Sequence, residues 1–247
     1  MITKAPVKAP ALSAPVNWTG FYIGGLGGAG YGRSDPTFAA APATVNTVAF
    51  PGAAADNRVA GFLGGGAVGY NYQMGAWVLG AEADLAWTNI RGSKACGSTA
   101  PTAAGPTNAL FTSTCHDQLN WLATATGRLG YSWGRTLWYA KAGAAWTHEN
   151  FSVTCNNGPT NGTNGPQDCF NPAGALFNTI SASSNRVGWT VGVGSEFALT
   201  EHWSARGELD YLGFGSKNLT ATDGTVLSTK LNFWTSKVGV NYRFSSR

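Results

Sequence analysis

Apolar and polar residues alternate with a period of two along most of this chain. In the segment 76–89, Trp77, Leu79, Leu85 and Trp87 fall on one face, with two alanines between them, and the acidic residues fall on the other. A helix would mix these two sets around its circumference, whereas successive side chains of a strand point to opposite faces. The alternation therefore predicts a β-strand, one longer than the usual half-buried strand of a soluble domain.

The same alternation recurs in seven further segments. Five show it strongly, and they span residues 118–133, 136–148, 186–199, 203–215 and 229–244. Two others, residues 19–33 and 59–73, are diluted by glycine, although Phe62, Val68 and Tyr70 still mark an apolar face on the second. The segment 19–33 is counted as a strand because an even number of strands closes a barrel with both chain ends on one side. In the segment 118–133, Leu119 is expected on the outward apolar face together with Trp121 and Leu129.

The connections between these segments alternate between short and long. Short ones fall near residues 74–75, 134–135 and 200–202, and long ones at about 34–58, 91–117, 149–185 and 216–228. Short turns on one side and long loops on the other are typical of a bacterial outer-membrane barrel. We therefore expect an all-β, eight-stranded antiparallel up-and-down transmembrane β-barrel, with four long extracellular loops, short periplasmic turns and both termini in the periplasm.

This fold would divide the chain into three parts. Residues 1–17, rich in Ala, Pro and Lys, form the predicted disordered periplasmic tail, residues 18–244 the barrel, and residues 245–247 a C-terminal extension. In the tail, Lys4 and Lys8 are candidates for contact with the cell wall.

Aromatic residues are expected to form two girdles at the membrane interfaces. Trp77 and Trp87 are ten residues apart, which in a tilted strand is roughly 25 Å along the membrane normal, the height of the apolar band. The predicted lower girdle contains Trp77, Trp133, Trp138, Trp203, Tyr242 and Phe244, and the upper one Trp87, Trp121, Trp146, Trp189 and Trp234. The alternative is that these rings fill the core of a soluble β-sandwich.

Composition favours the membrane interpretation. Only 11% of the 247 residues are charged and 12% are aromatic, whereas an ordinary soluble domain carries about 25% charged residues. No run of about 18 apolar residues is present, which excludes a transmembrane helix. The net charge of +4 is scattered without a Lys/Arg cluster, so no nucleic-acid partner is expected.

Ten charged residues fall on the inward faces of the predicted strands. They are Glu82, Asp84, Glu196, Glu208 and Asp210, and Arg128, Lys141, Arg206, Lys237 and Arg243. A small barrel has little interior space beyond its side chains, and buried charges must pair or lose several kcal/mol each, an order of magnitude set by desolvation. We expect an interlocking salt-bridge network. A lined pore, or a catalytic carboxylate pair formed by Glu82 and Asp84, is the alternative.

The four cysteines lie in two of the predicted long loops. We predict the disulfides Cys96–Cys115 and Cys155–Cys169, each worth about 3 kcal/mol by chain entropy. A metal site that combines cysteines with His116 is the alternative, but no Cys-x-x-Cys spacing supports it. No metal and no other cofactor is therefore expected.

Other candidate chemistry is weak. The segments Gly25–Gly30 and Gly64–Gly69 both fit the pattern G-x-G-x-x-G, yet a dinucleotide site needs a helix after the glycines, and no helical pattern follows. Glycine in these strands instead permits curvature and the close approach of neighbouring side chains. His148 and Glu149 lack an accompanying nucleophile motif, so the chain is not expected to be an enzyme.

Several segments resemble a known family. The segment Asn17-Trp-Thr-Gly-Phe-Tyr-Ile-Gly-Gly, after a Pro/Ala/Lys tail, is similar to the first strand of the outer membrane immunogenic proteins of alpha-proteobacteria, small surface-antigen porins of the OmpA-like barrel group. The segments Gly127–Tyr131, Leu137–Gly143, Gly188–Glu196 and Val238–Phe244 look similar too. The resemblance implies an abundant surface barrel that supports envelope integrity and is recognised by host immunity. Chains of this family usually end on an aromatic residue, whereas here three residues follow Phe244.

The sequence therefore favours a non-enzymatic surface barrel of the outer membrane, with loops for external contacts. A small diffusion porin and a ligand-binding protein, for haem or adhesion, are the alternatives. The expected partners are outer-membrane lipid and lipopolysaccharide, whose phosphates Arg91, Lys94 and Lys217 are placed to contact. The oligomeric state is left open.

Overall fold

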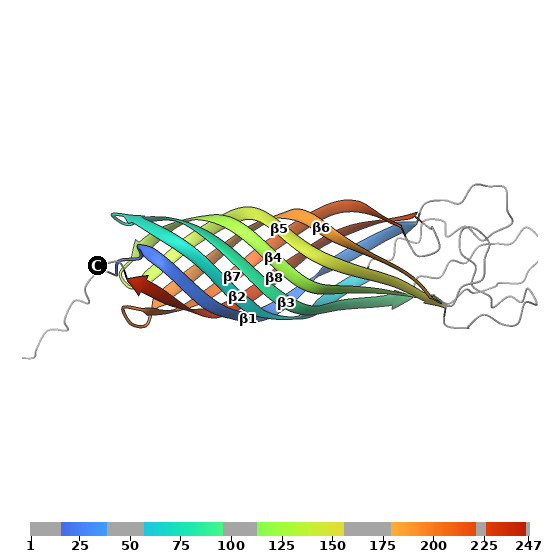
Figure 1. Cartoon of the computed structure of the whole chain (residues 1–247), viewed down its shortest axis with the longest axis horizontal. Coiled ribbons are helices and arrows are strands. Elements are labelled where there is room, and N and C mark those ends of the chain that lie inside the picture. The colour runs from blue at the N-terminus through green and yellow to red at the C-terminus, as the bar shows by residue number, and fades with distance from the viewer. Residues whose placement is uncertain (1–15, 39–56, 96–112, 156–178, 221–225, 246–247) are drawn as a thin grey trace, which may run out of the picture.

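The computed structural model describes residues 16–38, 57–95, 113–155, 179–220 and 226–245, which form one closed barrel (Figure 1). Each strand pairs antiparallel with its neighbours in sequence, and the ring closes where β1 pairs with β8. The strands are β1 (Gly20–Phe38), β2 (Asn57–Met74), β3 (Trp77–Ala95), β4 (Ser113–Trp133), β5 (Thr136–Cys155), β6 (Thr179–Ala198), β7 (Trp203–Thr220) and β8 (Val226–Ser245). The predicted fold is confirmed, whereas the long connections lie largely outside the described residues, as does the predicted tail up to residue 15.

The short connections are tight turns at one end of the barrel, called here the turn end. Gly75 and Gly134 occupy the turns after β2 and β4 with φ of 63° and 62°, a conformation that glycine adopts without a Cβ clash. Gly20 pairs with Ser245, so the barrel begins and ends at the turn end (Figure 1). Among the described residues, no helix is long and apolar enough to cross a membrane.

The pairing register shows how strongly the strands tilt. Successive cross-strand partners lead from Gly20 once round the ring and back to β1 at Gly30, ten residues further along. In an eight-stranded barrel this stagger corresponds to a tilt of roughly 40°. Each residue then rises roughly 2.4 Å along the barrel axis, and each step to the partner on the next strand in chain order rises roughly 3 Å. These increments allow residues on different strands to be compared in height.

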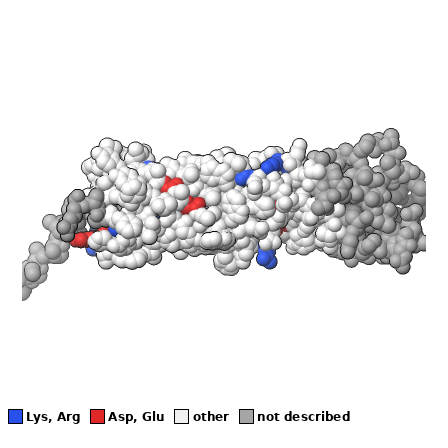
Figure 2. Space-filling view, in the orientation of Figure 1, with Lys and Arg blue, Asp and Glu red and all other residues white. Residues whose placement is uncertain are grey.

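Apolar side chains cover the outer face of the barrel from the turn end to beyond its middle. Trp87 and Trp133 are 70% and 78% exposed, and Phe62 is 73% exposed. Figure 2 shows that much of this surface carries no charge and that Lys and Arg gather toward the opposite end, called here the loop end. An outer face of this kind requires lipid rather than water around it.

The strands extend further toward the loop end than the sequence predicted. β5 continues to Cys155 and β6 begins at Thr179, whereas the predicted segments ended at residue 148 and began at residue 186. In these extensions the polarity of the faces is inverted, because Phe151 and Val153 are buried while Ser152 and Ser181 lie outside. The prediction was wrong here because it followed only outward apolar residues.

A bulge corrects the predicted facing of Leu119. The β4–β5 register shifts between Leu119 and Leu122, and Leu119 is completely buried instead of lying on the outer face beside Trp121. A β-bulge inserts one extra residue in a strand and so reverses the in-and-out parity beyond it. Period-two counting through residue 120 therefore assigns Leu119 to the wrong face.

The β6–β7 ladder ends early. Its last pair toward the loop end is Trp189 with Gly213, although both strands continue beyond that pair. Arg186 spans from β6 to the Gly215 carbonyl, and the Lys217 ammonium donates to the Asn185 carbonyl. Side-chain hydrogen bonds thus join the two strands where the backbone ladder is missing.

Candidate functional site

All ten inward charged residues predicted from the sequence are buried in the barrel interior. They project from β3 to β8, whereas β1 and β2 contribute small and apolar side chains together with Tyr22 and Asn71 to the same space. Nine of the ten are joined by ion pairs of 4.0 Å or less. We call these nine the ionic layer, and they are Glu82, Asp84, Arg128, Lys141, Glu196, Arg206, Glu208, Asp210 and Lys237.

Glu82 organises the part of the ionic layer nearer the turn end. Its Oε2 accepts from Arg206 Nη1, lies 3.5 Å from Arg128 Nη1 and accepts from the Tyr22 hydroxyl at 2.7 Å. The Arg128 guanidinium lies 4.6 Å from the Tyr22 ring centroid and 5.0 Å from that of Tyr139. Glu82 therefore holds both guanidinium groups, and two aromatic faces also contact that of Arg128, which lowers the cost of burying these cations.

Two lysines organise the other part. Lys141 Nζ lies 2.8 Å from Glu208 Oε2 and 3.4 Å from Asp210 Oδ1. Lys237 Nζ lies 2.8 Å from Asp210 Oδ2 and 3.1 Å from Asp84 Oδ2. Each ammonium thus bridges acids from opposite walls of the barrel, β3 and β7, so the layer ties the strands together across the interior.

Arg243 takes a different position from the other nine. Its guanidinium donates to the backbone carbonyls of Asn17, Thr200 and Glu201 at 3.1 to 3.4 Å. It also lies 4.4 Å from the Trp18 ring centroid. Arg243 therefore fastens the turn end rather than the ionic layer.

Inward glycines make room for the ionic layer. A methyl group on Gly192 would overlap the Asp210 carboxylate, and one on Gly69 would overlap the Tyr22 hydroxyl. These two glycines thus leave room for the polar side chain of the residue directly paired on the neighbouring strand. This agrees with the close approach expected from the glycine-rich segments.

An apolar layer lies between the ionic layer and the turn end. Trp18, in the segment just before β1, is 1% exposed and packs with Val78, Leu137, Tyr139 and Ala198. Its backbone N–H donates to Gln73 and its indole N–H to the Ser132 hydroxyl, at 2.7 and 3.0 Å. The segment leading into β1 therefore folds into the barrel mouth and fills it.

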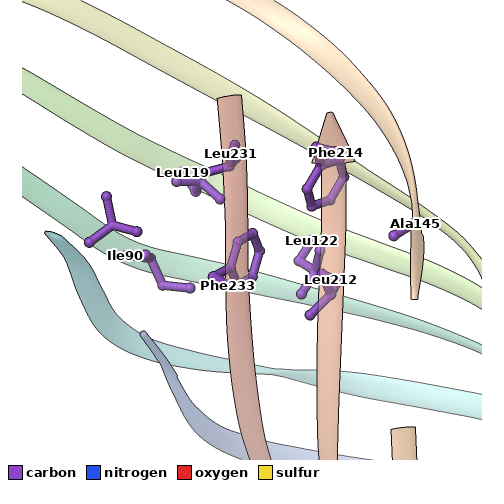
Figure 3. Close-up of a cluster of buried hydrophobic side chains, with 9 residues drawn as sticks. Ile90, Leu119, Leu122, Ala145, Leu212, Phe214, Leu231 and Phe233 are labelled. Carbon is purple, nitrogen blue, oxygen red and sulfur yellow. The ribbon is translucent and has the colours of Figure 1, made fainter. Parts of the chain in front are cut away.

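A second apolar layer lies on the loop-end side of the ionic layer. Figure 3 shows its side chains projecting from several strands toward one another. The Phe214 and Phe233 rings stack at 5.8 Å between centroids. Its members are Val59, Ile90, Leu119, Leu122, Ala145, Leu212, Phe214, Leu231 and Phe233. The ionic layer is thus enclosed between two apolar layers.

Sequence reasoning missed a buried ion pair level with the loop-end members of the second apolar layer. The Arg186 guanidinium donates to Glu149 Oε2 at 2.5 Å and to the Thr229 side chain and carbonyl. Both charged residues are essentially unexposed. The sequence prediction places Glu149 in a loop and Arg186 at the first residue of a strand segment. The signal that could have found them is the buried parity of Phe151 and Val153 continuing past residue 148.

The predicted girdle residues form two belts on the outer face. By the register increments, Trp87, Trp121, Trp146, Trp189 and Trp234 lie within about 4 Å of one height. The lower set lies roughly 23 Å below them. Most of these rings are exposed, and Trp121, Trp146 and Tyr242 are half-buried. This separation fits the apolar thickness of a membrane crossed by a barrel.

The predicted cysteine and histidine chemistry lies mostly outside the described side chains. Cys115 is buried and disulfide-bonded. Cys96, Cys155 and Cys169 have side chains that are not described, so both predicted pairings stay predictions. Within the described part of the chain, His, Cys, Asp and Glu form no group of three that could hold a metal ion.

Comparison with known proteins agrees with this architecture. Residues 5–244 match the family model described as "Outer membrane protein beta-barrel domain". The chain is 29% identical over 242 residues to the 31 kDa outer-membrane immunogenic protein of Brucella melitensis, covering 97% of this chain and 88% of that protein. It is 26% identical over 240 residues to the 25 kDa outer-membrane immunogenic protein of Brucella abortus, covering 97% and 85%.

Two solved structures are also similar. Neisserial surface protein A has a TM-score of 0.40 at 12% identity, covering 92% of this chain and 98% of that one. The outer membrane protein OprG from Pseudomonas aeruginosa has a TM-score of 0.47 at 11% identity, covering 94% and 99%.

The match of the family model to nearly the whole chain, and the names of the relatives, confirm the resemblance stated from the sequence and the outer-membrane location. This chain belongs to the outer membrane protein β-barrel domain family.

Proposed function

We propose that this protein is a closed, non-enzymatic surface barrel that supports the cell envelope and displays its four long connections outside the cell. The observation that carries the proposal is the enclosure of the ionic layer between two apolar layers. A diffusion channel needs a continuous wet path. Trp18 on one side and the Phe214–Phe233 stack on the other fill the interior along that path.

The same enclosure argues against catalysis by the interior carboxylates. Glu82 and Asp84 each contact cationic side chains, and their residues are 4% and 5% exposed. A substrate would have to displace an apolar layer and then break a buried ion pair, which costs about 3–5 kcal/mol. Both carboxylates therefore serve to hold the strands together.

The inverted strand extensions support an orientation with the loop end outside the cell and the turn end in the periplasm. Their outer faces are polar, so they belong in water beyond the membrane. An epitope tag within residues 156–178 should bind antibody on intact cells, whereas the same tag at Gly134 should bind only after the outer membrane is permeabilised. Labelling at Gly134 on intact cells would refute the orientation.

Ion conductance in a planar lipid bilayer tests the closed barrel. The full chain, shown to be folded by its altered gel mobility before boiling, should give no steady unitary steps. Removing the Trp18 side chain and the Phe233 side chain together should introduce steps, because both apolar layers are then opened. Steady steps from the unsubstituted protein would overturn the proposal and favour a small porin.

A further inference from the structure

Four exposed cationic side chains stand on four consecutive strands near the loop end. They are Lys230 on β8, Arg33 on β1, Arg58 on β2 and Arg91 on β3, and we call them the basic arc. By the register increments they lie within about 3 Å of one height, roughly 9 Å above the upper aromatic belt. This level is just outside the apolar band, within side-chain reach of the headgroup region of the outer leaflet.

The arc covers only part of the circumference. At comparable height the outer faces of β4 and β5 carry the neutral side chains Gln118 and Asn150, which pair directly across the two strands. Inside the arc, Arg33 pairs directly with Arg58, so their two side chains leave the outer wall side by side. An anion placed between the two guanidinium groups would make a charge-assisted contact with each of them.

A groove of about 540 Å³ lies on the outer wall at this point. Its lining includes Arg33 and Arg58 toward the loop end and Tyr31, Tyr211 and Trp234 toward the membrane. The Tyr211 and Trp234 rings lie 5.0 Å apart between centroids. Asp35 borders the groove as well and lowers its net positive charge. The groove therefore offers cations above amphipathic rings, the order in which a lipid presents its phosphate and its glycerol or sugar carbons.

Below the groove, past the exposed Phe62, four outward glycines leave one stretch of the outer wall of β1 and β2 without side chains. Gly25 pairs with Gly66 and Gly27 with Gly64, and added Cβ atoms at Gly25, Gly27 and Gly64 would meet no atom closer than 3.9 Å. These outward glycines leave a shallow furrow bordered by exposed Val238, Val240, Leu85 and Trp87. An acyl chain that descends from the groove has a smooth surface on which to pack.

We infer that the groove and furrow form one specific site for a phosphorylated lipid of the outer leaflet, such as lipid A. A phosphate is bound by Arg33 and Arg58, with Lys230 and Arg91 at either side, and an acyl chain packs along the glycine furrow. The inference rests on the proposed orientation with the loop end outside the cell. It gives the glycine-rich segments Gly25–Gly30 and Gly64–Gly69 a role in lipid binding. Their match to the nucleotide-loop pattern G-x-G-x-x-G does not suggest that role.

Native mass spectrometry of the full chain in mild detergent tests the site with diphosphoryl lipid A as the probe. The double variant R33A/R58A should weaken lipid A binding at least tenfold. Restoring the net charge elsewhere, with Q118R/N150R added to R33A/R58A, should not recover binding. Lipid A with both phosphates removed should bind the unsubstituted protein at least tenfold more weakly.

The furrow is tested separately with G27L/G64L, whose side chains point into open space, and with G127L on β4 as the matched control. G27L/G64L should weaken binding several-fold, and G127L should leave it unchanged. Recovery of binding by the relocated charges, equal binding of dephosphorylated lipid A, or full displacement by millimolar inorganic phosphate would each overturn the inference. A protein that is folded by gel mobility, gives no conductance steps and does not bind lipid A would overturn this inference but not the closed-barrel function. Failure of the lipid site and failure of the proposed function are therefore distinguishable.

Discussion

Replacing Lys141 with methionine should destabilise the barrel strongly, because this one ammonium serves most acids of the ionic layer. Lys141 Nζ lies within 4.0 Å of carboxylate oxygens from Glu82, Asp84, Glu208 and Asp210. Methionine keeps most of the length of the side chain and removes its charge. Removing one partner of a buried pair costs about 3–5 kcal/mol because the other charge is left uncompensated.

The loss in the free energy of unfolding should depend on the uncompensated carboxylate charge rather than on the missing lysine side chain itself. K141M leaves Lys237 and the two arginines to balance five carboxylates. Adding E208Q restores the balance, and the glutamine still accepts the Tyr139 hydroxyl bond that Glu208 Oε1 accepts at 2.6 Å. The double variant K141M/E208Q should therefore lose only about 1–2 kcal/mol, less than K141M alone.

Urea unfolding in phospholipid vesicles, followed by tryptophan fluorescence and by gel mobility without boiling, measures both variants. The lipid composition and ionic strength are kept constant. A loss below about 1 kcal/mol for K141M would contradict the argument, since burial without compensation should cost several times that. So would a double variant that is less stable than K141M, because its charges are better balanced.

Three further substitutions test other parts of the interior by the same unfolding assay. W18A should cost about 3–5 kcal/mol because a large side chain leaves the apolar layer at the turn end, and wild-type stability would show that this layer is dispensable. G192A should cost about 1–3 kcal/mol because its methyl group overlaps the Asp210 carboxylate. In the control G207A the methyl group points into open space, so the free energy of unfolding should change by no more than about 0.5 kcal/mol. Equal effects of the two substitutions would refute the steric argument. R186A should cost about 3–5 kcal/mol because Glu149 is left buried without its cation, and E149Q/R186A should recover part of the loss.

The number of strands and the facing of most residues could be predicted because both follow from local alternation. Trp77, Leu79 and Leu85 repeat outward at every second position on β3, and no tertiary information is needed to see it. The same parity brings Glu82 and Asp84 inward. Strand number then follows from counting such segments, since a membrane barrel cannot leave an edge unpaired.

Which charges meet could not be predicted, because pairing depends on register and tilt. Lys141 contacts acids on β3 and β7, which are not its neighbours in the sheet. Those contacts follow from the ten-residue stagger. The sequence does not show where each strand ends and its loop begins, so the stagger could not be worked out from it. The bulge at residues 119–122 was equally hidden, because one inserted residue leaves no change in composition.

The role of Trp18 was within reach of the sequence but was not drawn from it. Trp18 has the same parity as inward Tyr22, four residues later, so a strand that starts at Gly20 directs both side chains into the interior. The predicted barrel includes Trp18, but the predicted first strand segment begins at residue 19, which leaves Trp18 outside the alternating pattern. A large aromatic residue on the inward parity, just before the first strand, is a signal for a filled barrel mouth.

Period-two alternation alone does not reveal where the membrane ends. What marks the end is the point at which the apolar residues change from the outer face to the inner face. On β5, Trp138 lies outside and Lys141 inside, whereas nine residues beyond Lys141 Asn150 lies outside and Phe151 inside. The reversal falls near Trp146, at the height of the upper aromatic belt. Two independent features, ring placement and polarity reversal, thus mark the same boundary. The basic arc lies just beyond that boundary, so the lipid site proposed above would hold its phosphate outside the apolar band.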